Sequence, residues 1–399
     1  MRYTAAHLPS RWFFLPIHPG NVKLGTIFGL TEETSAAAPE NGPMTLDSWI
    51  SAAHGDPSGM WLLSTLSGLI VPRSFTWGEA ASIAMADAHT AQQVFGSATG
   101  RGSIIGNPQN EFIWGDGGLV HAWPANPGEN QYTAVPNSTV PTLLIGGTLD
   151  FQTPPQNATT ELLPHLPNGH QVILPGLGHA TDFWNYEPAA STHLLTTFYN
   201  TGKVDTSRYT PNTVRFTTPV TQDAIAEYLL AAMLGLAALT IASLAWLALR
   251  VRKRGAAGRK TSLAVRTVAA PFLGLGGWFA AALTVLTVFP TVSLASGPLA
   301  ILATSAPIAL GLYLAWTHRG QDRATNTQGL LAATVGALAG GWFGYTATSG
   351  LAALLTIIIG AVAAGNLALI ALDLFHHRPA RPAATTSQPA AQAALRTTP

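Results

Sequence analysis

The 399-residue chain contains no cysteine. Disulfide bonds, thiolate nucleophiles and cysteine metal sites are therefore excluded. Charged residues are also scarce, because Asp, Glu, Lys and Arg together make up only 10% of the sequence. Nothing in the residues that remain indicates a metal or an organic cofactor, and we expect none.

The few charges are distributed unevenly along the chain. Residues 1–222 contain 15 of the 19 Asp and Glu residues but only 8 of the 20 Lys and Arg residues. Residues 223–399 contain 4 acidic and 12 basic residues, and the basic ones fall in three short stretches between apolar segments. Because these stretches only separate hydrophobic segments, they do not indicate a nucleic-acid partner, and none is expected.

The C-terminal half contains five long segments without charge. The first has 22 residues, which form a helix about 33 Å long, against roughly 30 Å of bilayer hydrocarbon. We therefore predict that residues 223–373 form an all-α transmembrane bundle, with the lipid bilayer as a partner. Pro298 and Pro307 predict a kink in the third helix. The five predicted spans are 228–249, 267–289, 293–316, 329–348 and 351–372.

The basic stretches predict the orientation of these helices. They lie at residues 250–266, at Arg319 and Arg323, and after residue 373, whereas the other two connections contain no Lys or Arg. The positive-inside rule places all three stretches in the cytoplasm. An odd number of spans then places residues 1–222 outside, in a multi-pass protein of the cell membrane. Residues 374–399, rich in Pro, Ala and Thr, are expected to form a disordered cytoplasmic tail.

Two sequence blocks in the N-terminal half each deliver one titratable residue after an apolar run. Residues 140–158 read VPTLLIGGTLDFQTPPQNA and place Asp150 after the run; residues 173–184 read ILPGLGHATDFW and place His179 likewise. Loops after the ends of parallel strands commonly carry reactive groups. Between the blocks we predict a helix over residues 156–165, with Thr153 as its N-cap.

The two blocks resemble a known family. A strand followed by GGxxDxxTP, a helix, and a strand followed by PGxGH are similar to the C-terminal part of α/β-hydrolases of the tripeptidyl/prolyl aminopeptidase-like (TAP-like) group. The resemblance implies that Asp150 and His179 are catalytic, with Asp150 orienting His179 as the general base. It also implies a small peptide or acyl substrate. The plainer alternative is that Asp150 only caps a turn and His179 is a surface-loop histidine.

The nucleophile that this family requires is missing. No G-x-S-x-G motif occurs in the sequence; Gly55–Gly59 and Gly96–Gly100 come nearest, but with serine at the wrong offset. The fold class is therefore expected to be α/β-hydrolase-like, with a cap and the C-terminal part of the sheet but without the nucleophile half. Residues 1–139 are assigned to the cap, with a helix at 75–95, and residues 140–222 to the α/β part with acid and base.

The first twenty residues have neither a charged start nor a sustained apolar core, so they do not resemble an export signal. Together with the missing nucleophile, this leads us to expect the C-terminal part of a longer secreted and anchored hydrolase. The chain as it stands is then expected to be inactive. Ser64, Ser67, Ser97 and Ser103 are the alternative nucleophiles to examine.

Three hypotheses on function follow. The first is a membrane-anchored extracytoplasmic serine hydrolase of the peptidase or aminopeptidase type, and the second is an inactive hydrolase-like binding domain on a membrane anchor. The third is a transport or scaffold protein, although the five spans contain no internal charge that would mark an ion route. The motif GGWF, at 276–279 and again at 340–343, is expected to let helices pack closely.

Overall fold

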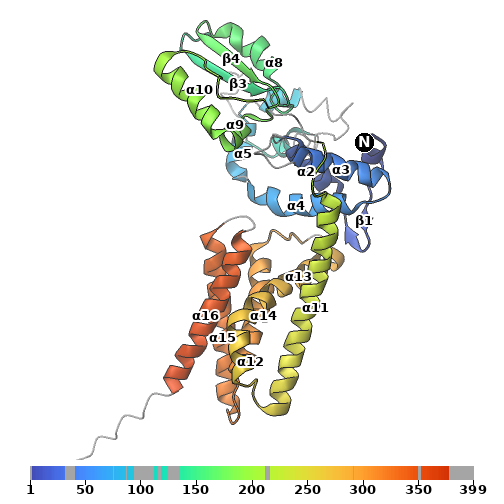
Figure 1. Cartoon of the computed structure of the whole chain (residues 1–399), viewed down its shortest axis with the longest axis vertical. Coiled ribbons are helices and arrows are strands. Elements are labelled where there is room, and N and C mark those ends of the chain that lie inside the picture. The colour runs from blue at the N-terminus through green and yellow to red at the C-terminus, as the bar shows by residue number, and fades with distance from the viewer. Residues whose placement is uncertain are drawn as a thin grey trace, which may run out of the picture.

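The chain has three parts arranged along its length (Figure 1). An α/β unit lies at one end, a group of shorter helices in the middle, and a bundle of long helices at the other end. The computed structural model describes residues 2–31, 41–74, 76–86, 88–93, 112–115, 118–124, 135–211, 216–290, 292–348 and 352–376.

The α/β unit is built on two parallel strands, β3 (Thr142–Gly147) and β4 (Gly169–Leu174), which pair along their whole length. The predicted pair of parallel strands with a helical segment between them is confirmed. That segment consists of three short pieces that follow one another without a break: α8 (Pro155–Asn157), a π-helix (Ala158–Leu162) and a 3₁₀-helix (Leu163–His165).

Two helices follow β4. They are α9 (Ala180–Tyr186) and α10 (Pro188–Thr201). The chain breaks at Glu187, whose dihedral angles are not helical, because Pro188 disfavours the helical conformation in the residue before it. Both helices cover the sheet: Phe183 and Leu194 pack with Val172 and Leu174 of β4 in one buried cluster.

Within the described residues, the only other sheet is a short antiparallel hairpin, β1 (Arg11–Trp12) with β2 (Leu15–Pro16). The α/β architecture is therefore seen in part, as one parallel strand pair with its helices. The predicted helix at 75–95 is divided into α5 (Trp77–Ala84) and α6 (Ala88–Ala91), and its first and last residues lie outside the described parts.

The middle part shares its hydrophobic core with the bundle. Trp12, Trp49 and Trp61 are buried in one cluster that also contains Leu230 and Met233 of the first long helix. The N-terminal helices therefore pack on one end of the bundle instead of forming a separate core. They are α1 (Arg2–Ala6), α2 (Pro19–Thr31), α3 (Asn41–Ala53) and α4 (Ser58–Ser74).

The carboxylate of Asp223 makes hydrogen bonds across this contact. Asp223 lies in the first turn of α11 (Gln222–Arg254) and accepts hydrogen bonds from the hydroxyls of Ser51 (2.6 Å) and Ser58 (3.2 Å). It also accepts one from the backbone N–H of Gly59, at 2.9 Å. Because α3 and α4 supply these donors, both helices are fixed to the start of the first long helix.

Among the residues that the structure describes, five helices are long and apolar enough to cross a membrane, as the sequence predicted, and they form the bundle. Pro298 lies in the first turn of its helix, where no N–H bond is lost, so only Pro307 interrupts the helix interior. The helices are α11; a continuous helix formed by α12 (Arg259–Ala264), the π-helix η6 (Val265–Ala269) and α13 (Ala270–Val288); α14 (Gly297–Trp316); α15 (Arg323–Ala347); and α16 (Ala352–His376).

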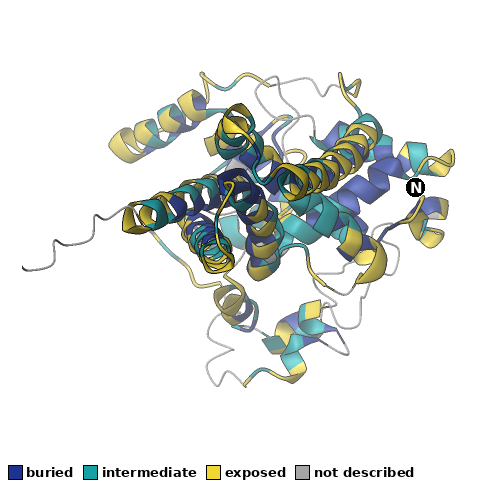
Figure 2. Cartoon of the chain, turned by 90° about the horizontal axis from the view of Figure 1, so that it is seen from below, coloured by how far each residue is buried: buried dark blue, intermediate teal, exposed yellow. Residues whose placement is uncertain are grey.

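Small residues allow the helices to approach closely, with their buried faces turned inward (Figure 2). A Cβ added to Gly340 would meet the carbonyl of Gly360 across the α15–α16 contact, and one added to Gly276 would meet Thr240 of α11. The packing role predicted for both GGWF motifs is confirmed for these glycines. Between helices in lipid, such close packing replaces the hydrophobic effect as the source of stability.

Polar contacts join the helices at their basic end. Asp373 accepts a 2.8 Å hydrogen bond from the indole N–H of the buried Trp316. Arg266 donates to the amide oxygen of Asn366 at 2.8 Å. Helix α16 continues to His376, so residues 374–376 are helical and not part of a disordered tail; residues 377–399 lie outside the described parts.

Replacing Gly340 with alanine is expected to destabilise the bundle by about 1–3 kcal/mol, because the new methyl group overlaps the backbone of α16. Gly235→Ala is the matched control, since a Cβ there meets no atom within 4 Å. Thermal unfolding in detergent measures both. Equal effects of the two variants would contradict the close helix contact.

Candidate active site

Gly147, the last residue of β3, allows the two strand-end loops to approach each other. A Cβ on Gly147 would collide with the carbonyls of Leu177 and Gly178, so only glycine fits there. The backbone N–H of Leu149 donates to the Leu177 carbonyl at 3.0 Å. The two loops therefore run side by side beyond the same edge of the sheet, and this brings the residues that follow them together.

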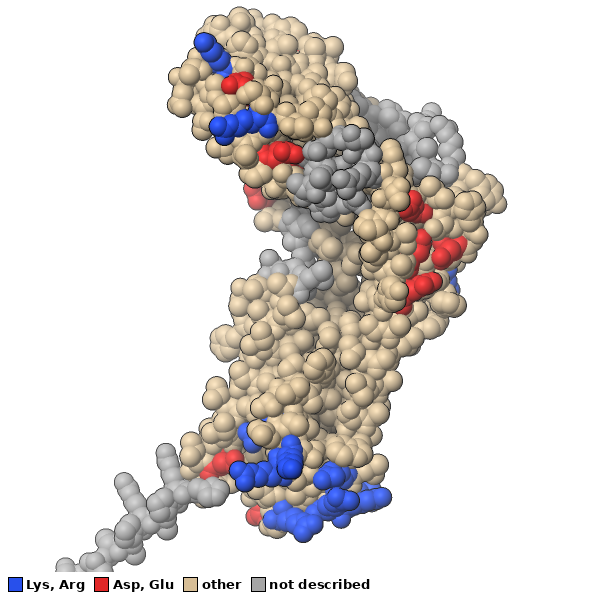
Figure 3. Space-filling model, in the orientation of Figure 1, with Lys and Arg blue, Asp and Glu red and all other residues tan. Residues whose placement is uncertain are grey.

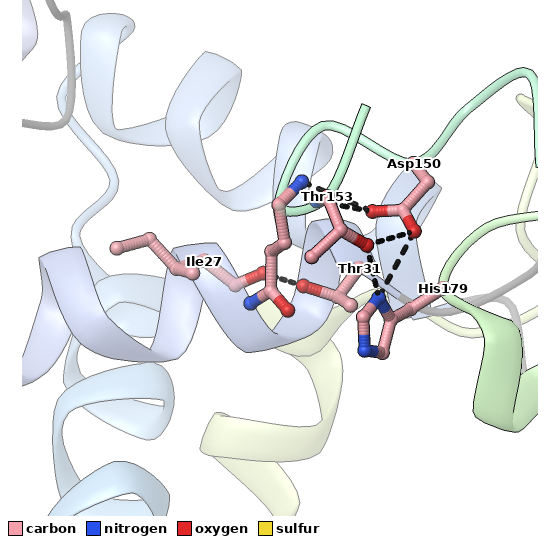
Figure 4. A network of polar contacts seen from close by, with 6 residues as sticks. Ile27, Thr31, Asp150, Thr153 and His179 are labelled. Atoms are coloured by element: carbon pink, nitrogen blue, oxygen red, sulfur yellow. Dashed lines mark hydrogen bonds and ion pairs between the residues drawn. The ribbon is translucent and has the colours of Figure 1, made fainter. Parts of the chain in front are cut away.

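Asp150 and His179 form a hydrogen bond at this edge (Figure 4). Oδ2 of Asp150 lies 3.0 Å from Nδ1 of His179, and the side chains are 2% and 30% exposed respectively. The predicted proximity of the two side chains is confirmed. The imidazole is thus anchored on one side by a buried carboxylate while part of the ring still reaches the surface.

The carboxylate of Asp150 has a full set of hydrogen-bond donors. Oδ1 accepts from the backbone N–H groups of Gln152 (3.1 Å) and Thr153 (3.0 Å), and Oδ2 accepts from the Thr153 hydroxyl at 2.8 Å. Burial alone would raise the pKa of Asp150, but the bonds from Thr153 and His179 outweigh it and lower the pKa below its usual value. Asp150 therefore stays ionised beside the imidazole.

Asp150 thus both caps its own turn, as the plainer reading of the sequence supposed, and contacts His179. Thr153 differs from its prediction. The helix begins at Pro155, and no side chain caps it. The Thr153 hydroxyl instead bonds Asp150 and lies 3.3 Å from Nδ1 of His179. An aspartate followed by threonine three residues later, before proline, was the sequence signal for this contact.

The hydrogen bond assigns the two ring nitrogens of His179. An ionised carboxylate can only accept, so Nδ1 carries the proton that it shares with Asp150. In the neutral ring Nε2 is then an acceptor, able to take a proton from a hydroxyl group. This is the arrangement of the acid and base in a catalytic triad.

The N-terminal helices reach this site. The carbonyl of Thr31, the last residue of α2, accepts a 3.2 Å hydrogen bond from the backbone N–H of His179. The Thr31 hydroxyl donates back to the Ile27 carbonyl at 2.6 Å (Figure 4). The sequence gave no signal for this contact, because a backbone carbonyl makes it.

The segment that carries both residues is similar to a known protein family. Residues 114–211 match the α/β-hydrolase family described as TAP-like protein. The match includes β3, β4, Asp150 and His179, and it confirms the resemblance predicted from the two sequence blocks. No curated protein and no solved structure matches the chain.

None of the alternative serines has a described contact with His179 of the TAP-like segment. Ser64 accepts a 2.9 Å bond from the His18 backbone, and Ser67 donates to the Leu63 carbonyl at 2.7 Å. Both are buried in α4. Ser97 and Ser103, like the Gly96–Gly100 stretch, lie outside the described residues.

A second His–Asp pair in the TAP-like segment has a different setting. Nε2 of His193, on α10, lies 2.9 Å from Oδ2 of Asp205. Hydrogen bonds from Ser207, and one from His193, lower the pKa of Asp205 to about 2. This pair joins α10 to the loop that follows it, and it lies at no strand end. Within the described residues, no group of three His, Asp or Glu side chains is placed to hold a metal ion.

Thr153→Val keeps the side-chain shape but removes the hydroxyl donor to Asp150. We expect a stability loss of about 1–3 kcal/mol at neutral pH, because a buried carboxylate oxygen loses a partner. A carboxylate whose pKa is lowered by folding stabilises the protein at pH values above its unfolded-state pKa. This stabilisation is lost as the pH falls through the folded-state pKa, so the stability difference between Thr153→Val and the wild type should shrink in acid. Thermal unfolding against pH measures it; Thr153→Ser, which keeps the hydroxyl, should behave like the wild type.

Proposed function

We propose that the TAP-like segment is the acid–base part of a serine hydrolase site, in a hydrolase of the peptidase or aminopeptidase type anchored in a membrane. The observation that carries the proposal is the 3.0 Å bond between a buried Asp150 and a partly exposed His179 beyond the ends of parallel strands. The family match supports the α/β-hydrolase fold for this segment.

In the proposed mechanism, Nε2 of His179 takes the proton of a serine hydroxyl as that oxygen attacks a carbonyl carbon. The imidazolium that forms is stabilised by Asp150, and it then returns the proton to the leaving group. The lowered pKa of Asp150 suits this role, because a carboxylate that stays ionised continues to accept the hydrogen bond from Nδ1 of His179.

The serine itself is proposed to come from a segment outside this sequence. None of the 399 residues lies in a G-x-S-x-G motif. The one hydroxyl bonded to the ring within the described residues, that of Thr153, lies on the Nδ1 side and donates to Asp150, so it cannot be activated by Nε2. A small peptide or acyl compound is the proposed substrate, by resemblance to the family.

A second candidate is a binding domain without catalysis, anchored in the membrane. It is favoured by the lack of a nucleophile near Nε2 in the described part of the chain. In that case the partly exposed His179, held by the buried Asp150, would present a polar group to a ligand, and the N-terminal helices that contact His179 through Thr31 would form part of the same surface.

We further propose that the TAP-like segment lies outside the cell membrane and the basic end of the bundle in the cytoplasm. Lys and Arg side chains gather at the end of the bundle far from the α/β unit (Figure 3). Loops with many positive charges are retained on the cytoplasmic side. If each of the five long helices in the described residues crosses the membrane, the start of α11 and the end of α16 lie on opposite sides.

A serine-directed fluorophosphonate probe tests the catalytic proposal. We expect no labelling of this chain alone, and labelling when upstream coding sequence that contains a G-x-S-x-G serine is joined in frame. In that longer protein His179→Gln should lower the labelling rate about 10⁴-fold or more. His193→Gln, in the second His–Asp pair, is the matched control and should label normally.

Labelling of this chain alone that His179→Gln abolishes would show a nucleophile within the 399 residues. Equal labelling of the longer wild-type protein and its His179→Gln variant would exclude the base role. An upstream sequence without such a serine, together with no labelling, would favour the binding domain.

The absence of cysteine allows a direct test of sidedness. Single cysteines at Ser207, which is exposed in the α/β part, and at Ala256, in the basic loop, are treated with an impermeant maleimide in intact cells. We expect labelling at position 207 and protection at 256. Moving each charge across the membrane costs about 2.3 kcal/mol per 100 mV of membrane potential, so the seven cations of residues 250–266 resist translocation. The reverse labelling pattern would overturn the proposed orientation.

A further inference from the structure

A groove on the side of the bundle is not used by the proposed hydrolase site. It lies between α11 and the continuous helix formed by α12, η6 and α13, and it has a volume of 570 Å³. Leu247 and Leu273 form a buried floor, whereas Trp246 and Phe272 at the rim are 52% and 55% exposed. The groove therefore opens sideways, toward the surface that faces lipid in a membrane.

A π-helical turn forms part of one wall. Val265, Val268 and Ala269 line the groove and belong to η6. Single π-helical turns inside a longer helix are rare and occur frequently at functional sites. Among the five long helices, this π-helical turn occurs in one of the two helices that form the groove. It is an observation separate from the groove's apolar lining.

The groove has a positively charged mouth. Lys260 is among its lining residues, is exposed, and has no hydrogen-bond or ion-pair partner among the described residues. Trp246 lines the groove on the opposite helix, and the guanidinium of Arg250 lies over its ring at 5.4 Å. No acidic residue occurs between Arg250 and Arg266. The mouth therefore offers an unpaired cation beside an aromatic ring.

We propose that this groove binds one anionic phospholipid. The acyl chain lies along the apolar wall between α11 and α13, and the phosphate lies against the ammonium of Lys260. Basic pockets between membrane helices favour anionic headgroups, and tryptophan is enriched at the level of the headgroups. The volume falls within the roughly 300–1,000 Å³ of small-molecule sites. This proposal does not depend on the hydrolase function.

The combined chemistry favours a lipid over other occupants. A single exposed lysine holds a free phosphate weakly in water, whereas an acyl chain adds apolar contact along the groove. A helix from a second copy would cover the apolar rim but would leave Lys260 without an anion. The lipid satisfies both the apolar wall and the charge.

Native mass spectrometry of the full chain tests the charge. The protein is released from nanodiscs of phosphatidylcholine with phosphatidylglycerol, and the retained lipid is counted. We expect one tightly retained phosphatidylglycerol and roughly fivefold weaker binding in Lys260→Gln. Lys253→Gln removes the same charge from the same basic stretch, but Lys253 lies in the last turn of α11 and does not line the groove, so this variant should retain the lipid. Equal losses of phosphatidylglycerol in the two variants would indicate only a general attraction between basic residues and anionic lipid, and would overturn the proposal.

A second pair of variants tests the groove itself with all charges kept. Ser243 lines the groove, so Ser243→Trp fills it. Its neighbour Ala242 is exposed and does not line the groove, so Ala242→Trp is the matched control. Only Ser243→Trp should lose the lipid, with thermal unfolding showing that both variants fold. Unchanged retention in Ser243→Trp would overturn the proposal. So would equal binding of water-soluble glycerol phosphate, or a dimer crosslinked through Ser243→Cys that excludes phosphatidylglycerol.

Discussion

The carboxylate of Asp223 is the contact on which the arrangement of the three parts depends. It stands in the first turn of α11 and holds α3 and α4 through three donors, so the middle helices are fixed to the bundle. Helix α2, packed on α4, ends at Thr31, whose carbonyl receives the backbone N–H of His179. A continuous series of contacts therefore runs from the first membrane helix to the Asp150–His179 pair. The site is positioned relative to the bundle by packed helices and not by the linker alone.

The five long helices could be predicted because length and the lack of charge decide them locally, whatever the partners. The packing of the N-terminal helices could not. Trp12, Trp49 and Trp61 show no helical or strand periodicity in the sequence. They come together in one buried cluster with residues of α11. The bond of Asp373 is a similar case: its partner Trp316 comes from a different helix, so no local pattern in the sequence shows this hydrogen bond.

At the site, Asp150 and His179 could be predicted because parallel strands bring their carboxyl ends to one edge. Thr153 was placed wrongly, since threonine before proline is a common start of a helix, whereas its hydroxyl bonds Asp150 and no side chain caps the helix. Thr31 contributes only its carbonyl to the site, which every residue possesses, so no side-chain pattern identifies it. Sequence reasoning therefore finds groups that are chemically distinctive and misses those that act through the backbone.

The cations of residues 250–266, which lie in α11, α12 and η6, have different surroundings, although the sequence presents them as one basic stretch. Arg250 bonds the carbonyl of Ala257 through Nε at 2.8 Å and lies over Trp246, and Arg266 bonds Asn366 of α16. These two side chains join elements of the bundle, so their charge is held in place by structure. Lys260 has no such bond among the described residues and lines the apolar groove. All seven cations of residues 250–266 favour the same side of a membrane. Among them, Lys260 lines the groove, where an acyl chain and an anionic headgroup would be bound together.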